Sequence, residues 1–232
     1  MVNISIKSSK FVPKKNKAMK YNTIIFDLDG TLTDTLYDLM LSTNHALLEM
    51  GWPERTLEEV RQFVGNGVRR LMEQAVPSDT EEEEFEECFR IFQEHYLEHC
   101  QDHTALYPGI AELLQKLHQR GYKMAIVSNK LQAGVDELYR TFFQDTIQVA
   151  IGEREGVRRK PMPDMVQLAL EQLGSTPEES IYVGDSEVDM ATARNAGLPC
   201  ISVLWGFRDQ DYLREIGAFR MVSTPAEILN LV

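Results

Sequence analysis

Hydrophobic positions follow two different rhythms along the chain, and together they predict a helical block placed inside an alternating region of strands and helices. Tyr21–Leu28 is a short β-branched and aromatic run that stops at the turn dipeptide Asp29-Gly30, which predicts a buried strand. Residues 36–100 then show apolar positions at helical spacing and no strand signal. The helices expected in this block are Leu36–Met50, Leu57–Val64, Val68–Val76 and Thr80–Cys100.

After Pro108-Gly109 the pattern alternates between strands and helices. The strands expected are Tyr122–Ser128, a short one near Thr146–Ile151, Ile181–Val183 and Pro199–Val203. The helices expected are Ile110–Arg120, Gln132–Phe142, Asp164–Leu173, Glu187–Ala196 and Pro225–Leu231. Strands joined by crossover helices are parallel, and a parallel sheet is covered by helices on both faces. The pattern therefore predicts an α/β fold, with a three-layer, Rossmann-like parallel sheet as its core.

The length of 232 residues fits one large domain or a core with a smaller insertion. We expect the α/β core to comprise residues 19–34 and 105–232, and the inserted α-helical cap domain to comprise residues 35–104. Residues 1–18 contain five lysines and no acid, which predicts a disordered basic extension or a tag. In a parallel sheet ligands bind beyond the carboxyl ends of the strands, so candidate chemistry is sought there.

The net charge and the cysteine content limit which classes of binding partner and which cellular compartment are expected. The chain has 24 Lys+Arg against 36 Asp+Glu, a net charge of −12, which argues against binding to nucleic acid or an anionic membrane. No secretory signal and no window long enough to span a membrane is found. Three cysteines without a C-x-x-C pair fit a reducing compartment. We therefore expect a cytoplasmic protein. The sequence does not give the oligomeric state, and a monomer or a homodimer is expected.

One cluster of metal-ligating residue types lies near the end of the last helix in the block. His95 and His99 are spaced i, i+4, with Cys100 and His103 close behind. The same helix starts with the acidic run Glu81–Glu84, and a fourth ligand is not evident. A polar helix end is favoured over a structural zinc site.

The first strand ends in two carboxylates. Asp27 and Asp29 are two positions apart on an extended segment, so they project to the same side, about 6.6 Å apart along the strand. Gly30 lets the chain turn with its amides facing inward, as an anionic group requires. An Asp-Gly turn without function is the alternative, but the whole string DLDGTL is too specific to be common by chance.

The second strand ends in Ser128-Asn129, whose hydroxyl and amide can bond phosphate oxygens, although these residues are also ordinary turn formers. Lys160 lies in the loop before a helix, next to Pro161, and could neutralise a phosphoryl group as a compact point charge. A solvated basic turn is an equally good explanation of that loop taken alone.

A later strand, Ile181–Val183, is followed by Asp185 and Asp189, which would share one face of the next helix's first turn. Acids at this position could simply complement the helix dipole. Together with Asp27 and Asp29, however, they would form a cluster of four carboxylates that repel one another unless a cation is present. Hard oxygen ligands of this kind suit Mg²⁺.

Four pieces of sequence, DLDGTL, SN, KP and GDSEVD, occur in this order at strand ends or before a helix. They resemble the four signature motifs of the haloacid dehalogenase (HAD) superfamily of phosphotransferases, and the helical block resembles its C1-type cap. The segments DLDGTLTDTLYDL, FVGNGVRRLMEQAV and VLWGF are similar to phosphoglycolate phosphatase-like members. The resemblance covers residues 19–232.

The resemblance implies a Mg²⁺-dependent phosphatase that hydrolyses a small phosphorylated metabolite through an aspartyl-phosphate. Asp27 would be the nucleophile and Asp29 the general acid and then base. Mg²⁺ would be held by Asp27, Asp185 and the backbone carbonyl of Asp29, with Asp189 beside this set. The phosphoryl oxygens would be bound by Ser128, Asn129, Lys160 and the amides around Gly30 and Thr31.

Several alternatives stay open beside a phosphoglycolate phosphatase. A pyrophosphatase or a sugar or nucleotide phosphatase would have the same motifs, because the cap recognises the leaving group. A β-phosphoglucomutase-like enzyme typically has His and Glu where this chain has Leu39 and Gly184. A noncatalytic phospho-metabolite sensor is the candidate from another class. Gly65-Asn66-Gly67, followed by Arg69 and Arg70, is either a cap loop that meets the site or a turn between helices whose arginines face solvent.

Overall fold

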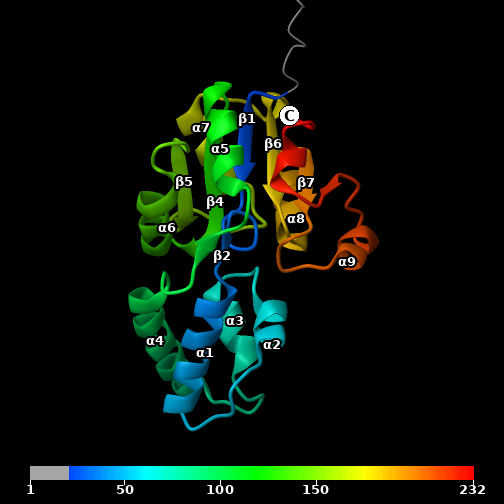
Figure 1. The fold of residues 1–232 in the computed structure, drawn as a ribbon. Helices are drawn as coiled ribbons and strands as arrows, with labels where there is room; N and C mark the ends of the chain where they lie inside the picture. Colours follow the sequence, from blue (N-terminus) through cyan, green and yellow to red (C-terminus); the bar gives the residue numbers. More distant parts are fainter. Residues whose placement is uncertain (1–20) are drawn as a thin grey trace, which may run out of the picture.

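The structure, a computed structural model, describes residues 21–232, so the basic extension expected over residues 1–18 lies outside the described residues. A six-stranded sheet has the strand order β5-β4-β1-β6-β7-β8, and every pair of neighbours in it is parallel. In that order the strands are Val149–Glu153, Lys123–Leu131, Thr23–Phe26, Ser180–Gly184, Cys200–Val203 and Met221–Val222. The predicted parallel α/β fold is confirmed, with β1 at the centre between β4 and β6 (Figure 1).

Alternating side chains of the sheet bury two separate apolar clusters, one on each face. Ile24 and Phe26 pack with residues of α5 (Ile110–Gln119), α6 (Gln132–Leu138) and α10 (Pro225–Ile228). Ile25 packs on the other face with residues of α7 (Asp164–Leu173) and α8 (Glu187–Ala196). Helices therefore cover both faces, which gives the expected three layers.

The helical block forms a bundle beyond the carboxyl ends of the strands, as Figure 1 shows. Its helices are α1 (Leu36–Glu49), α2 (Leu57–Phe63), α3 (Val68–Ala75) and α4 (Glu82–His99). They bury a third apolar cluster, and Phe207, which follows β7, joins it from the α/β part. A division into core and cap domains at residues 34 and 105 stays a prediction.

Two short strands connect the sheet region to the bundle. β2 (Thr33–Asp34) and β3 (Ala105–Leu106) pair antiparallel. Asp38, at the start of α1, is fully buried next to this crossing and accepts hydrogen bonds from the backbone N–H of His103 (3.0 Å) and from the backbone N–H and hydroxyl of Thr104 (both 2.8 Å). The Asp38 carboxylate thus joins the segment that leaves the sheet for the bundle to the segment that returns to it.

Several element boundaries differ from the predicted ones for local reasons. Val64 and Val76 have extended backbones and end α2 and α3 one residue early. Val76 precedes Pro77, and a residue before proline is disfavoured in the helical region. The helix expected over Gln132–Phe142 changes to a π-helical turn at Tyr139–Phe143.

Some short elements were not predicted: the 3₁₀ turn Pro177–Glu179, α9 (Gln210–Glu215), β8 and the β2–β3 pair. Each is too short to show a hydrophobic period. Among the described residues, no helix has both the length and the apolar character needed to cross a membrane.

Candidate active site

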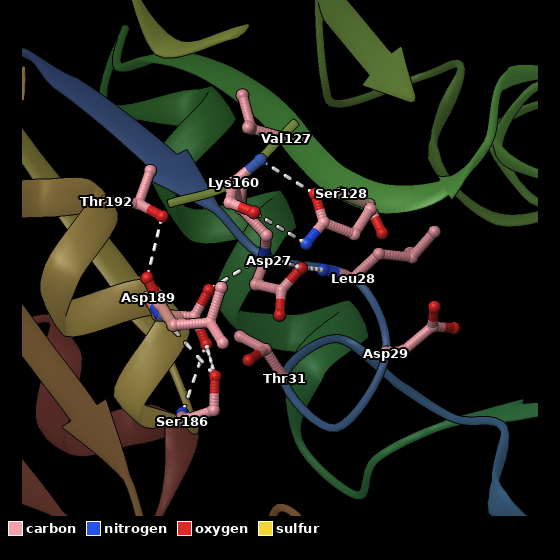
Figure 2. A network of polar contacts seen from close by, with 12 residues as sticks. Asp27, Leu28, Asp29, Thr31, Val127, Ser128, Lys160, Ser186, Asp189 and Thr192 are labelled. Atoms are coloured by element: carbon pink, nitrogen blue, oxygen red, sulfur yellow. Dashed lines mark hydrogen bonds and ion pairs between the residues drawn. The ribbon is translucent and has the colours of Figure 1, made fainter. Parts of the chain in front are cut away.

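The predicted site residues meet at one edge of the sheet. Asp27 directly follows β1, Ser128 lies in β4 and Asp185 directly follows β6, so three neighbouring parallel strands deliver them to one place. Lys160 arrives from the loop between β5 and α7. Figure 2 shows Lys160 lying against both Asp27 and Asp189. The carboxyl ends of parallel strands are where ligands bind in such folds.

Lys160 is a buried cation between two carboxylates. Its side chain is 2% exposed, and its Nζ lies 2.7 Å from Asp27 Oδ1 and 2.8 Å from Asp189 Oδ1. Burial lowers the pKa of Lys160, but the charges of Asp189 and Asp27 raise it more, so the ammonium is kept. The solvated basic turn considered as an alternative is therefore excluded.

Asn129 fixes the backbone of Lys160 rather than pointing a free amide into the site. Its Oδ1 accepts from the Lys160 backbone N–H at 2.8 Å, and its Nδ2 donates to the Lys160 carbonyl at 3.2 Å. This geometry supports a positioning role in place of the direct phosphate contact expected for Asn129. Ser128 is buried beside it, lines the pocket, and accepts from the backbone N–H of Lys130 at 3.1 Å.

Three carboxylates converge next to Lys160. Ligand oxygens of Asp27, Asp185 and Asp189 all lie within 4.8 Å of one another, and all three residues are buried. Burial and the neighbouring charges of Asp189 and Asp185 raise the pKa of Asp27 despite Lys160. Burial and the charge of Asp189 raise the pKa of Asp185 to about 7. One ammonium against three carboxylates leaves an excess negative charge, which a hard divalent cation fits.

Asp189 is the most engaged of the three. Its Oδ1 accepts from Lys160 and, at 3.2 Å, from the Tyr182 hydroxyl; its Oδ2 accepts from the backbone N–H (3.1 Å) and hydroxyl (2.6 Å) of Ser186. Burial alone would raise the pKa of Asp189, but Lys160 and Ser186 together lower it. These bonds occupy both oxygens, which favours a supporting position beside the cation over direct ligation.

Asp185 is held by two groups and closely surrounded by backbone. Its Oδ2 accepts from the backbone N–H of Phe207 at 2.7 Å and its Oδ1 from the Thr31 hydroxyl at 3.2 Å. Gly30 has φ +84°, and a Cβ there would approach Asp185 Oδ2 to 2.5 Å. A Cβ on Gly206 would approach the same oxygen equally closely. Glycine at these two positions leaves Asp185 its room.

The phosphate-binding role expected for the amides of Gly30 and Thr31 is not supported. The Gly30 N–H donates to the Thr33 carbonyl at 2.9 Å, and the Thr31 N–H donates to the Leu28 carbonyl at 3.2 Å. Both amides are used inside the turn itself. Thr31 instead acts on the site through its hydroxyl on Asp185.

Asp29 lies apart from the Lys160 cluster, as Figure 2 shows, yet it lines the same pocket as Asp27. Its side chain is 17% exposed, and its Oδ1 lies 3.5 Å from the Nζ of Lys130. The pocket is roofed by apolar side chains of the bundle, among them Leu39, Val64 and Leu71. Asp27 and Asp29 can therefore face one substrate, as their spacing predicts.

The Gly65–Gly67 loop of the bundle reaches the pocket, but its neighbouring arginines do not. Gly65 and Gly67 line the pocket, and Asn129 Nδ2 donates to the Gly65 carbonyl at 3.5 Å. Arg69 forms an ion pair with Glu86, and Arg70 pairs with Glu73 at 2.9 Å. Each of the two possibilities considered from the sequence is therefore partly right. The loop meets the site, while the arginines bind carboxylates at the surface.

The histidines and the cysteine considered for zinc take separate partners. His95 Nδ1 lies 3.0 Å from the Ser42 hydroxyl, His99 Nδ1 lies 2.8 Å from Asp102, and Cys100 contacts Glu137. Within residues 21–232 the aspartate cluster is the only group of such side chains close enough to hold a metal.

The pocket residues that were not singled out from the sequence include Tyr96 of α4, Lys130 of β4, and Arg208, which follows β7. Lys130 and Tyr96 form a hydrogen bond inside the pocket. Arg208 donates to the carbonyl of Val64 at 2.8 Å and pairs with Glu187. The one sequence feature that could have indicated Lys130 is its position directly after Ser128-Asn129. The strand was predicted to end at Ser128, so no role was assigned to the lysine that follows.

Comparison with known proteins agrees with this geometry. A family model described as "Haloacid dehalogenase-like hydrolase" matches residues 24–203. A phosphoglycolate phosphatase of Aquifex aeolicus is 36% identical over 213 residues, covering 90% of this chain and 95% of the relative. A Listeria innocua pyrophosphatase is 30% identical over 217 residues, covering 92% and 97%.

Solved structures agree as well. The crystal structure of a putative phosphoglycolate phosphatase from Lactobacillus delbrueckii matches with a TM-score of 0.87 and 34% identity, covering 92% of this chain and 98% of that one. The family resemblance drawn from the four motifs is confirmed. A carboxylate at a strand tip, a buried lysine and an aspartate cluster thus coincide with matches along most of the chain: it belongs to the haloacid dehalogenase-like hydrolases.

Proposed function

We propose that this protein is a divalent-metal-dependent phosphatase that hydrolyses a small phosphomonoester through phosphorylation of Asp27. The observation that carries the proposal is the buried ion triad in which Lys160 lies between Asp27 and Asp189, with Asp29 in the same pocket. Relatives named phosphoglycolate phosphatase at 30–36% identity support 2-phosphoglycolate as the first substrate to test.

Asp27 is held as a nucleophile would need to be. Its Oδ1 accepts from the backbone N–H of Leu28 at 2.7 Å and from Lys160 at 2.7 Å, so the carboxylate is fixed in orientation. Lys160 would also neutralise the transferring phosphoryl oxygens, and the Ser128 hydroxyl would bond one of them. Asp29, at the other side of the pocket, would donate a proton to the leaving oxygen and later take one from water.

The donor set fits a hard divalent cation such as Mg²⁺. Asp27, Asp185 and the backbone carbonyl of Asp29 would hold it, with Asp189 fixing Lys160 next to it. When bound, the cation supplies positive charge that orients the phosphoryl group and offsets the repulsion among the carboxylates. Burial raises the pKa values of Asp27 and Asp185, and the charge of the neighbouring Asp189 raises them further.

The bundle, residues 35–104, would act as a cap that excludes water and contacts the organic part of the substrate. Support comes from the apolar side chains Leu39, Val64, Val68 and Leu71, which line the pocket opposite the strand ends.

A cytoplasmic location and a monomeric or homodimeric state complete the proposal. The three free cysteines fit a reducing compartment.

A mutase of the β-phosphoglucomutase type is disfavoured by the site. A Cβ on Gly184 would overlap the side chain of Asp189, so a glutamate has no room there. Leu39, at the other diagnostic position, is buried in the bundle's apolar cluster. Pyrophosphatase is the second candidate, because of the relative from Listeria innocua. The full set of reacting groups argues against a sensor without turnover.

The test is phosphate release by the purified protein with Mg²⁺ from 2-phosphoglycolate, pyrophosphate, sugar phosphates and nucleotides. We expect turnover that EDTA abolishes and that Asp27→Asn lacks, although the variant folds. Asp136→Asn, which changes an acid on the surface of α6, is the matched control and should retain activity. A folded protein with no turnover of any ester, or an active Asp27→Asn variant, would overturn the proposal.

A further inference from the structure

Lys130 is a buried cation that the proposed chemistry does not use. It lies in β4 directly after Ser128 and Asn129, its side chain is 2% exposed, and it lines the pocket that contains Asp27 and Asp29. Its Nζ donates to the hydroxyl of Tyr96 and lies 4.5 Å from the centre of the Tyr96 ring. Burying a charge in this way is costly unless a counter-charge is close.

Lys130 has the weakest ion pair of the three cations that line the pocket. Lys160 has carboxylate oxygens at 2.7 and 2.8 Å, and Arg208 has those of Glu187 at 2.8 and 3.1 Å. In the described part of the chain, Asp29 is the only carboxylate whose oxygen lies within 4.0 Å of the Lys130 Nζ, at 3.5 Å. An ammonium has three N–H donors, and Lys130 finds two acceptors among residues 21–232, Tyr96 and Asp29.

The two buried lysines lie on different sides of the reacting bond. Lys160 contacts the proposed nucleophile Asp27, so it lies with the phosphoryl group that is transferred. Lys130 is next to Asp29, the group proposed to protonate the leaving oxygen, so it lies with the leaving group. The pocket is also lined by apolar side chains of the bundle, such as Val68 and Leu71.

We propose that Lys130 binds an anionic group on the leaving group, so that the pocket selects phosphate compounds whose leaving group carries its own negative charge close to the bridging oxygen. This inference rests on the proposed phosphatase function and names its substrate class. A carboxylate two bonds from the ester oxygen, as in 2-phosphoglycolate, would meet the ammonium and supply its missing partner. The second phosphate of pyrophosphate offers the same chemistry from another source.

Tyr96 and Asp29 prepare Lys130 for this contact. The Tyr96 hydroxyl fixes the ammonium from the bundle side, and Asp29 attracts it from the strand side without pairing closely. A fixed cation in a site shielded from water binds an anion more strongly than a solvated one does. The apolar walls would bind a neutral leaving group only by its size, so charge supplies the discrimination.

The experiment compares two esters of nearly equal size, 2-phosphoglycolate and 2-hydroxyethyl phosphate, which differ in a carboxylate against a neutral hydroxymethyl group. Wild type should favour 2-phosphoglycolate in kcat/KM by about tenfold or more, the worth of a charged hydrogen bond. Lys130→Met should lower kcat/KM for 2-phosphoglycolate by a similar factor, mainly through KM, and change it little for the neutral ester. Pyrophosphate is run beside them, and the better of the two anionic substrates identifies carboxylate or phosphate as the group bound.

Tyr96→Phe is the matched variant, because it keeps the ring and removes only the hydroxyl that contacts Lys130. It should weaken the preference for the anionic ester less than Lys130→Met does, because the ammonium remains although the hydroxyl that fixes it is gone. An equal loss for both esters in Lys130→Met would mean that Lys130 only positions Asp29, and would overturn the inference while leaving the phosphatase intact.

A second measurement needs no variant and decides the matter if Lys130→Met does not fold. Glycolate should inhibit wild-type hydrolysis of p-nitrophenyl phosphate competitively, and ethylene glycol at the same concentration should not. Equal effects of the two compounds, or a wild type without preference between the esters, would overturn the inference. A wild type that hydrolyses none of the phosphate compounds tested, p-nitrophenyl phosphate included, would instead refute the proposed function.

Discussion

Replacing Lys160 by methionine removes the ammonium between Asp27 and Asp189 and keeps a side chain of similar length. In the wild-type protein this ammonium lies 2.7 and 2.8 Å from the two carboxylates and is 2% exposed. The variant would leave Asp27, Asp185 and Asp189 facing one another, with their oxygens within 4.8 Å. It therefore isolates what the lysine contributes to holding this cluster together.

Breaking a buried ion pair from one side costs about 3–5 kcal/mol, because the remaining charge stays buried without a partner. For a chain of this size, that loss of unfolding free energy lowers the midpoint of thermal unfolding by about 6–20 °C. Lys123→Met is the matched control: that lysine is half-buried and donates to the Gly174 carbonyl at 2.6 Å in a hydrogen bond at the surface, so its loss should cost less than about 1 kcal/mol.

The pH dependence follows from the direction of the pKa shift of Asp189. In wild type the pKa is lowered, so the stability from this carboxylate is present above its unfolded pKa and is lost as the pH falls through the folded one. Without Lys160 the pKa of Asp189 is higher than in wild type, because burial still raises it and only Ser186 remains to lower it, so the destabilisation is relieved as the pH falls. The difference in midpoint between variant and wild type should hence be larger at pH 8 than at pH 5.5.

Thermal unfolding at both pH values, with and without Mg²⁺, tests the reasoning. At pH 8, Mg²⁺ should raise the midpoint of Lys160→Met more than that of wild type, because the variant's cluster has more uncompensated charge. A variant that unfolds within about a degree of wild type at pH 8, and responds to Mg²⁺ to the same extent, would refute the account of Lys160.

Three further substitutions test other parts of the structure. Gly184→Ala would place a methyl group against Asp189 and should cost about 1–3 kcal/mol by overpacking, measured by denaturant unfolding; unchanged stability would contradict the close approach. Asp38→Ala removes a buried carboxylate that accepts several hydrogen bonds and should cost about 2–4 kcal/mol in the same assay, whereas a loss below about 0.5 kcal/mol would show that the crossing is held by other contacts. Burial and the neighbouring His45 lower the pKa of His95, so the stability of the wild type should fall as the pH drops through about 6.5, the ordinary histidine pKa. In His95→Gln the thermal-unfolding midpoint should change less between pH 7.5 and 5.5 than it does in wild type. Midpoints that change with pH equally in both proteins would contradict this.

The parts of the fold and site that could be predicted from the sequence depend on local pattern. Asp27, Ser128 and Asp185 each follow an apolar run, and the rule that parallel strands present their carboxyl ends at one edge brings them together. The family resemblance then supplied their roles.

The parts that could not be predicted depend on contacts between distant positions. Asp38 and His103 are 65 positions apart, and nothing near either indicates the other. The partner of Asn129 is the backbone of Lys160, 31 positions away. The side-chain amide that the motif suggested for phosphate binding therefore holds the Lys160 backbone in place. The amides of Gly30 and Thr31 donate to carbonyls within their own turn, and these hydrogen bonds follow from a backbone geometry that composition does not fix.

The central claim is that Asp27 is phosphorylated during turnover, and Asp29→Asn makes this directly measurable. An activated leaving group such as p-nitrophenolate departs without a proton donor, whereas hydrolysis of the phosphorylated enzyme still needs the base that this variant lacks. With Mg²⁺ and p-nitrophenyl phosphate, Asp29→Asn should therefore release one burst of p-nitrophenolate and accumulate phosphorylated protein. Mass spectrometry of acid-quenched samples should place the phosphoryl group on Asp27, and the double variant Asp27→Asn, Asp29→Asn should show none. Steady turnover by Asp29→Asn at the wild-type rate, or a phosphoryl group on any other residue, would contradict the account.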